Sequence, residues 1–295
     1  MDPWPHIEAA IRDVTSARFT IESRSRVEAG GGCINYCYVV RGKGEAFFVK
    51  LNRPDRLPMF EAEAAGLAEI SRSRTVRVPR PLCHGAGDDA SWLVLEHIEL
   101  GRPGRKGMEG LGRNLAEMHR VKAADFGWYR DNTIGATPQI NRPGSDWTAF
   151  WRDCRLGYQL KLAADNGHRG RLLGRGEALL ARLPNILDGH TPQPSLLHGD
   201  LWSGNVAVSQ DKTPVVFDPA VYYGDREADL AMTELFGGFS EDFYRAYDQA
   251  YPRDRGYEVR KLLYKLYHVL NHLNLFGGAY GAQAERMIET LLAEP

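Results

Sequence analysis

Two carboxylates and an amide stand at spacings that suit phosphoryl transfer. Asp200 precedes Asn205 by five residues, and Asp218 follows the short apolar run 215–217. In such a reaction the attacking hydroxyl loses its proton, which a carboxylate can accept. The metal ion that bridges the phosphates prefers hard oxygen ligands, here an asparagine amide and a second aspartate. Taken singly, each fragment could also be a polar loop with a turn-forming asparagine or a capping aspartate. Together they predict a catalytic base and a Mg²⁺ site.

The first hundred residues contain candidates for binding a nucleotide through the main chain. Gly31, Gly32 and Cys33 lie between two strand-like runs, where glycines let backbone N–H groups approach phosphates. A plain hairpin turn is the competing interpretation. Glu96 and Ile98 stand at the end of a later apolar run, where we expect the backbone to hydrogen-bond an adenine ring.

Lys50 is the candidate cation for the phosphates. It lies at the end of the apolar strand 48–50, which suits a phosphate-neutralising cation better than a solvated one. Glu63 follows thirteen residues later on a predicted helix. A lysine–glutamate pair between such a strand and helix is a known way to hold the lysine in position. Glu61 on the same helix is the competing partner, and the pattern favours Glu63.

The elements that must position these residues change character near residue 101. Strand-like runs occupy 18–27, 34–40, 46–51, 82–84 and 92–96, with one helical segment at 60–70. After the glycine- and proline-containing break at 101–104, helical patterns recur at 111–118, 146–164, 172–183, 226–236, 242–250 and 257–276. We therefore predict an α+β, bilobal chain. Its N-lobe at 1–100 would hold a five-stranded sheet, the glycine-rich loop and one long helix. Its helical C-lobe at 101–295 would hold the catalytic and metal loops and the substrate site.

Composition excludes several classes of protein. The 295 residues include 37 basic and 38 acidic ones, for a net charge of −1, so bulk binding to nucleic acid or to a membrane surface is not expected. No apolar run approaches the ~20 residues that span a bilayer, and the N-terminal stretch lacks the apolar core of a signal peptide. The four cysteines form no Cys-x-x-Cys pair, which is typical of reduced thiols in the cytoplasm. No His/Cys cluster has the spacing of a zinc site.

Longer blocks around the chemical residues resemble a known family. The catalytic loop reads His-Gly-Asp and the metal loop Asp-Pro-Ala, the forms seen in aminoglycoside phosphotransferases and choline kinases. These belong to the small-molecule branch of the protein-kinase-like fold. Residues 197–205 and 218–230 closely resemble the fructosamine/ketosamine-3-kinase family, as do 31–35, 59–64 and 135–139. The resemblance runs from about residue 15 to the C-terminus.

This resemblance implies an ATP cleft between the two lobes and a kinase that uses ATP and Mg²⁺. Its substrate would be a ketosamine, the adduct of a sugar and an amine, either a small molecule or protein-bound. Phosphate on the 3-hydroxyl destabilises the adduct, which then frees the amine, so the activity is deglycation, a form of protein repair. The implied roles are catalytic base for Asp200, Mg²⁺ ligand for Asn205 and Asp218, phosphate contact for Lys50 with its partner Glu63, and phosphate loop for Gly31, Gly32 and Cys33.

Several residues are open to two interpretations. Trp202 lies two residues past the proposed base, where its ring could cover the sugar or could belong to the core. The polar stretch 131–141 could line the sugar site or form a surface loop. Asp229 opens a helix, and we expect it to brace the catalytic loop. Three histidines on helical patterns are expected to be structural, with satisfied hydrogen bonds: His119, His268 and His272.

Rival functions differ in the acceptor or in the class of protein. A small-molecule kinase for an aminoglycoside or choline is the nearest rival. A pseudokinase that binds ATP and regulates a partner is disfavoured, because Lys50, Glu63, Asp200, Asn205 and Asp218 are all present. A Rossmann domain is excluded, since no Gly-x-Gly-x-x-Gly follows a first strand. The preferred sugar stays open, and so does the choice between a monomer and a redox-linked homodimer.

Cys33 generates a prediction about redox control. A thiol among backbone N–H groups and near Lys50 would gain thiolate character and be open to oxidation. Cys37 on the next strand would lie ~13 Å away, out of disulfide reach, so a Cys33–Cys33 bond between two chains is the more plausible oxidised form. The resemblance points the same way, since a cysteine at this position is a family feature linked to redox sensitivity. The alternative is a small residue in a tight turn.

We expect peroxide to lower turnover reversibly and to produce a dimer band on a non-reducing gel. Cys33→Ala should show neither effect. Dithiothreitol should restore the activity of the wild-type protein. If both proteins respond alike, or neither forms the band, Cys33 is only a turn residue.

Overall fold

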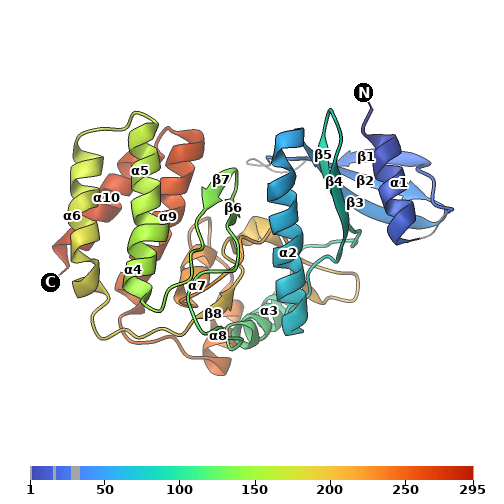
Figure 1. The fold of residues 1–295 in the computed structure, drawn as a ribbon. Helices are drawn as coiled ribbons and strands as arrows, with labels where there is room; N and C mark the ends of the chain where they lie inside the picture. The colour runs from blue at the N-terminus through green and yellow to red at the C-terminus, as the bar shows by residue number, and fades with distance from the viewer. Residues whose placement is uncertain (1, 16–17, 28–33, 295) are drawn as a thin grey trace. The chain divides into compact units, whose positions relative to one another are not determined.

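The computed structural model describes residues 2–15, 18–27 and 34–294. The chain divides into two compact units (Figure 1). The first unit comprises Met1–Gly107 and Gly204–Pro219, and the second comprises Met108–Ser203 and Ala220–Pro295. Within the described residues, no helix combines the length and the apolar character that crossing a membrane requires.

The first unit is built on an antiparallel sheet of five strands in the order β1-β2-β3-β5-β4. The strands are β1 Ser23–Val27, β2 Tyr36–Gly42, β3 Glu45–Asn52, β4 Pro81–Ala86 and β5 Ser91–Glu96. Lys43 and Gly44 join β2 to β3 with φ of 52° and 81°. Positive φ at both positions gives a two-residue turn whose twist matches that of the flanking strands.

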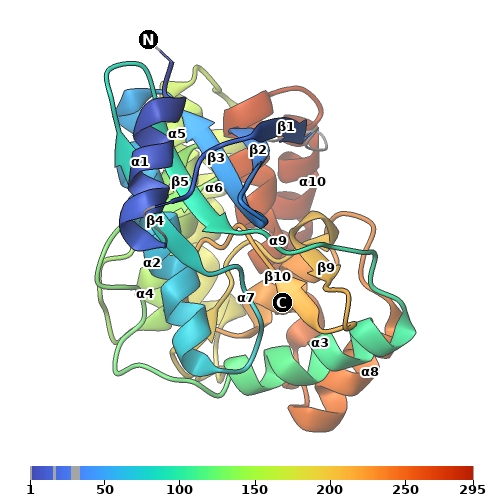
Figure 2. The ribbon, with the colours of Figure 1, turned by 90° about the vertical axis from the view of Figure 1, so that its right-hand side faces the viewer.

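Two helices pack on this sheet, and in Figure 1 the strands β4 and β5 lie between them. α1 (Trp4–Val14) packs on β4 and β5 (Figure 2). It buries Ile7 and Ile11 among Phe19, Val49 and Trp92. α2 (Leu57–Ser73) also packs on β4 and β5. A short hairpin from later in the chain, β9 (Val206–Val208) with β10 (Pro214–Val216), belongs to the same unit.

The second unit is mainly helical. Its helices are α4 Trp147–Trp151, α5 Gly157–Asp165, α6 Arg171–Ile186, α7 Glu227–Thr233, α8 Glu241–Ala250, α9 Tyr257–Phe276, α10 Tyr280–Ala293 and most of α3 Arg105–Met118. The π-helical turn Arg152–Leu156 joins α4 to α5. α9 packs against α5, α7 and α10, and α6 packs against α10 (Figure 1).

Two small hairpin-like ladders complete the second unit. β6 (Asn132–Ile134) pairs with β7 (Thr137–Gln139), and β8 (Ser195–Leu197) pairs with β11 (Tyr222–Gly224). Both are antiparallel. The β8–β11 pair fixes where the chain enters residues 198–205, because the loop begins directly after β8.

Candidate active site

Lys50 lies in β3 with its side chain buried between two carboxylates of the first unit. Its Nζ is 2.6 Å from Glu63 Oε1 and 2.6 Å from Asp218 Oδ1. The Lys50 side chain is only 4% exposed, whereas that of Asp218 is 48% exposed. The pairing predicted for Glu63 is confirmed, while the contact with Asp218, 168 residues away in sequence, was not predicted.

The two carboxylates keep the Lys50 ammonium charged. Burial disfavours the charge, but attraction to Asp218 and then to Glu63 outweighs it and raises the pKa of Lys50. An ammonium has three N–H donors, and the two carboxylates use two of them. The third can therefore serve an anionic ligand such as a phosphate.

Asn205 and Asp218 come to the same end of the β9–β10 hairpin. Val206 pairs with Val216, so the residue before β9 and the residues after β10 lie at one end of the ladder. The Phe217 N–H donates to the Asn205 carbonyl at 3.2 Å. Asp218 adopts a φ of 57°, a left-handed conformation that aspartate tolerates better than most residues. Carboxylate and amide oxygens fit the hard-ligand preference of Mg²⁺, and the half-exposed Asp218 is open to a ligand.

The segment after β5 offers main-chain groups to a ligand. The Glu96 carboxylate accepts from Arg77 Nη2 and from the Arg80 N–H, each at 3.2 Å, so this side chain serves the structure. Within the described part of the chain, the Ile98 main chain makes no hydrogen bond. A pocket of about 390 Å³ beside it is lined by Arg77, His97, Ile98, Glu99, Ser209, Gln210 and Asp211.

The glycine-rich turn lies outside the described residues. Gly31, Gly32 and Cys33 all fall in the gap between residues 27 and 34. Their roles as a phosphate loop and, for Cys33, as a redox site stay predictions.

In the second unit, the loop that carries Asp200 requires a glycine beside it. Gly199 has a φ of 82°, and a Cβ there would stand 2.0 Å from the Ala220 carbonyl oxygen. The Ala220 N–H in turn donates to the His198 carbonyl at 2.8 Å. The Asp200 N–H donates to His198 Nδ1 at 3.2 Å. Close backbone approach and local hydrogen bonds therefore set the position of Asp200.

Asp229 is the buried anchor of this loop, as predicted. Its carboxylate accepts from the N–H groups of His198 at 2.7 Å and Gly199 at 2.8 Å, and it lies 3.2 Å from His119 Nε2. His119 Nδ1 lies 2.8 Å from the hydroxyl of Tyr247. Although burial opposes ionisation, these contacts hold the pKa of Asp229 below its ordinary value, so it stays an anion.

Burial lowers the pKa of His119, which favours the neutral ring. Its structural role is thus confirmed, and His272 is satisfied by the His268 carbonyl at 2.8 Å. For His268 the expectation of satisfied hydrogen bonds was wrong, because its buried Nδ1 has no hydrogen-bond partner among the residues that the structure describes. Burial, with a smaller effect of the neighbouring His272, lowers the pKa of His268 to about 3, so the ring is neutral.

Trp202 belongs to a row of rings at the surface of the second unit. Its ring centroid lies 5.9 Å from that of Phe236, which lies 4.8 Å from that of His272. Trp202 and Phe236 are half-buried. The ring is therefore neither fully buried in the core nor fully exposed, and its contact with the sugar stays a prediction.

The stretch 131–141 is not a surface loop. It forms the β6–β7 hairpin, and three of its polar side chains are buried and bonded within the protein, namely those of Asn132, Gln139 and Asn141. Short strands rich in polar residues lack the apolar alternation by which strands are recognised in a sequence.

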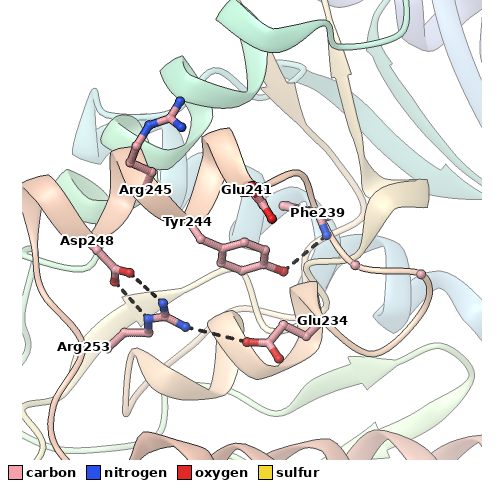
Figure 3. A pocket seen from close by; sticks show the side chains of 9 residues that line it. Glu234, Phe239, Glu241, Tyr244, Arg245, Asp248 and Arg253 are labelled. Atoms are coloured by element: carbon pink, nitrogen blue, oxygen red, sulfur yellow. Dashed lines mark hydrogen bonds and ion pairs between the residues drawn. The ribbon is translucent and has the colours of Figure 1, made fainter.

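Two further groups of charged side chains in the second unit bond to partners within the protein. A cavity of about 540 Å³ beside α8 holds Arg253, which pairs with Asp248 at 2.6 Å and with Glu234 at 3.9 Å (Figure 3). His190, Asp225 and Glu227 also lie close together. However, Asp225 accepts from the Tyr264 hydroxyl and contacts His190 Nε2, and Glu227 accepts two hydrogen bonds from Arg260. These side chains are therefore bonded within the protein.

Comparison with known proteins identifies relatives along the whole chain. The family model described as fructosamine kinase matches residues 3–294. A probable ketoamine kinase of Synechocystis sp. is 46% identical over 98% of this chain and 97% of its own length. A protein named chloroplastic protein-ribulosamine 3-kinase, of Arabidopsis thaliana, is 45% identical over 89% of this chain and 81% of its own.

Solved structures agree with the fold. A putative fructosamine-3-kinase from Haemophilus somnus gives a TM-score of 0.88 at 28% identity, covering 97% of this chain and 96% of its own. The choline kinase LicA of Streptococcus pneumoniae gives 0.64 at 16% identity, covering 98% of this chain and all of its own, and so shares the fold alone. The α+β, protein-kinase-like fold expected from the sequence is confirmed.

Replacing Asp229 tests its role as an anchor. In Asp229→Asn the amide group would face N–H donors, so we expect a loss of about 1–3 kcal/mol in the free energy of unfolding. Because the folded-state pKa of Asp229 is lowered, its contribution is present above the unfolded pKa and is lost as pH falls through the folded value. The variant should therefore lose less stability than the wild type on acidification, measured by urea unfolding at several pH values.

Asp146→Asn is the matched control. Asp146 also accepts a backbone N–H, from Ala149 at 3.0 Å at the start of α4. Asparagine caps a helix about as well as aspartate, so this variant should unfold like the wild type. Equal stability of Asp229→Asn and wild type across the pH range would contradict the anchoring role.

Proposed function

The chain belongs to the fructosamine kinase family, and on that premise we propose that it is an ATP-dependent kinase that phosphorylates the 3-hydroxyl of ketosamines. The observation that carries the proposal is the intact phosphoryl-transfer set, whose lysine is held by two carboxylates and whose catalytic loop is anchored on Asp229. The relatives named ketoamine kinase and ribulosamine 3-kinase support the same acceptor class.

The first unit would bind the nucleotide. The third N–H of Lys50, which neither Glu63 nor Asp218 uses, suits a phosphate oxygen. The main chain of Ile98, which bonds to none of the described residues, suits the edge of an adenine ring. Gly31, Gly32 and Cys33 would cradle the phosphates with their backbone N–H groups. Asn205 and Asp218 would hold Mg²⁺, which neutralises phosphate charge when bound.

The second unit would supply the base and the acceptor site. Asp200 accepts the proton of the 3-hydroxyl while the hydroxyl oxygen forms a bond to the γ-phosphorus of ATP. The bond between that phosphorus and the ADP oxygen breaks at the same time. Trp202, backed by Phe236, offers an aromatic face on which the sugar could lie. The phosphorylated adduct then decomposes and frees its amine.

The wider setting follows from the same proposal. Ketosamines on small amines and on protein lysines are both candidate substrates, so the activity would repair glycated molecules. We place the enzyme in the cytoplasm, where its few cysteines would stay reduced, with no nucleic-acid or membrane partner. It would act as a monomer or as a homodimer linked through Cys33.

The function is tested by ATP turnover over a panel of acceptors. Fructosamine, ribulosamine and erythrulosamine derivatives of lysine would be compared with choline and kanamycin. Mass spectrometry of each glycated lysine should show gain of one phosphate, followed by loss of the sugar and recovery of lysine. Phosphorylation of choline or kanamycin without turnover of any ketosamine would favour the rival acceptor class, and ATP binding without transfer to any acceptor would favour a pseudokinase.

Asp200→Asn tests the base. The amide keeps the size of the side chain but cannot accept the proton, and general-base help is worth about 10²–10⁴-fold. We expect kcat to fall by that factor while the affinity for MgATP is retained. Asp165→Asn, an exposed change at the end of α5, should leave kcat unchanged. Wild-type turnover by Asp200→Asn would exclude Asp200 as the base.

A further inference from the structure

Arg155 is a fully buried cation with no carboxylate partner in the part of the chain that the structure describes. Its exposed fraction is 0%. The guanidinium lies over the rings of Tyr222 at 4.0 Å and Phe150 at 4.7 Å. Its Nε has no hydrogen-bond partner among the described residues. Burying a charge without a counter-ion is costly, so a specific set of neutral groups must hold it there.

The neutral groups that hold Arg155 belong mostly to the chain around β7. Nη1 donates to the Ile140 carbonyl at 2.6 Å and to the Cys154 carbonyl at 3.0 Å, and Nη2 donates to Asn141 Oδ1 at 2.8 Å. The planar fork of the guanidinium makes these bonds together, which a single ammonium could not do. Arg155 lies in the π-helical turn between α4 and α5, a departure from α-helix that often marks a functional position.

From Asn141 a chain of buried amides continues through the β6–β7 hairpin. Asn141 Nδ2 donates to Asn132 Oδ1 at 2.9 Å, and Gln139 Nε2 donates to the same oxygen at 2.8 Å. The Tyr267 hydroxyl donates to Gln139 Oε1 at 2.8 Å. Both hairpin strands and α9 lie within the second unit, where Figure 1 shows them beside one another.

The chain of amides ends on residues 220–221, which bond to the loop that carries Asp200. Asn132 Nδ2 donates to the Val221 carbonyl at 2.8 Å, and Gln139 Nε2 donates to the Ala220 carbonyl at 3.0 Å. The Ala220 N–H donates to the carbonyl of His198, two residues before the proposed base. The same Ala220 carbonyl oxygen is the atom that a Cβ on Gly199 would meet.

We propose that Arg155 is a positioning residue for catalysis, which sets the catalytic loop through Asn141, Asn132 and Gln139 by fixing the Ala220 and Val221 carbonyls. This rests on the proposed kinase function, since the loop matters because it carries the base. Asp229 holds the loop from one side through the His198 and Gly199 N–H groups, and the amide chain holds it through Ala220. None of the four residues is required to touch the substrate.

Arg155→Lys tests the proposal with the charge retained. Lysine cannot reproduce the fork, so the contacts to Ile140 and Asn141 cannot both survive. We expect kcat to fall by roughly 10²-fold, the loss associated with misplacing a reacting group by about 1 Å. The KM for MgATP should not change, because the residues proposed to bind it belong to the first unit. A wild-type kcat in folded Arg155→Lys would overturn the proposal.

Arg182→Lys is the matched control. Arg182 also donates through its two terminal nitrogens to main-chain carbonyls, those of Leu292 and Glu294, each at 3.0 Å. It lies on α6, and its side chain bonds to main-chain carbonyls near the C-terminus and not to the amide chain. This variant should keep the wild-type kcat, and an equal loss in both variants would reduce Arg155 to a general structural role.

A second variant tests the proposal if Arg155→Lys does not fold, and hydrogen exchange tests it if the acceptor assignment is wrong. Gln139→Met removes the donor to Ala220 and should lower kcat in the same way, and a wild-type kcat there contradicts the proposal. In the double variant the losses should be less than additive, as expected for one network. Additive losses would show that the two residues act separately.

Hydrogen exchange read by mass spectrometry needs no substrate. In Arg155→Lys, or in Gln139→Met if the former is unstable, amide exchange should rise about tenfold in segments 198–200 and 220–222. Arg182→Lys should leave both segments as in the wild type. Faster exchange confined to 147–165 would overturn the inference about Arg155, whereas wild-type protein that turns over no ketosamine would overturn the proposed function instead.

Discussion

The buried ammonium of Lys50 is the interaction on which the first unit depends. A lysine with a 4% exposed side chain is tolerable only beside opposite charge, and it has two carboxylates at 2.6 Å. To supply them, α2 must lie where Glu63 can reach Lys50 on β3. The β9–β10 hairpin must likewise end where Asp218 can reach the same lysine. The left-handed backbone of Asp218 is a local cost of that meeting. One cation thus joins β3 and α2, which are close in sequence, to Asp218, which is 168 residues from Lys50.

The second unit uses buried charge in the same way but with different partners. Asp229 is an anion held by N–H groups, and Arg155 is a cation held by carbonyls, an amide and aromatic rings. Asp229 bonds directly to the start of the loop 198–202, a segment that forms neither a helix nor a strand. Such a loop has no ladder of its own to fix it, so its geometry comes from polar groups buried beneath it. The buried hydrogen bonds of Asp229 and of the amide chain accordingly meet at residues 198–199 and 220–221.

Sequence reasoning succeeded where local pattern and chemistry coincide. α9 occupies the predicted range 257–276, because its apolar face repeats over five turns. The Lys50–Glu63 pair and the anchoring role of Asp229 followed from motif spacing. Membership of the fructosamine kinase family followed from the blocks around Asp200 and Asp218.

The missed features depend on contacts that a sequence does not display. The Lys50–Asp218 contact joins residues 168 apart, and Arg155 looks like any charged residue on a helical pattern. The predicted strand 18–27 is regular only from Ser23, and the helix predicted at 146–164 is interrupted by a π-helical turn. The helix α10 near the C-terminus was not predicted. Tertiary contacts, which a sequence does not display, determine the Lys50–Asp218 pair and the burial of Arg155.

The most direct test of this account is the affinity for MgATP of two variants on α2, measured by calorimetry. Glu63→Gln removes one of the charges that hold Lys50, leaving the ammonium drawn toward Asp218 alone. Charge-assisted hydrogen bonds of this kind contribute about 1.5–3 kcal/mol, so we expect MgATP to bind roughly tenfold or more weakly. Glu61→Gln makes the same chemical change on the same helix and should bind MgATP as the wild type does. Equal affinities in the two variants would contradict the claim that Lys50, set by Glu63, is the cation that receives the phosphates.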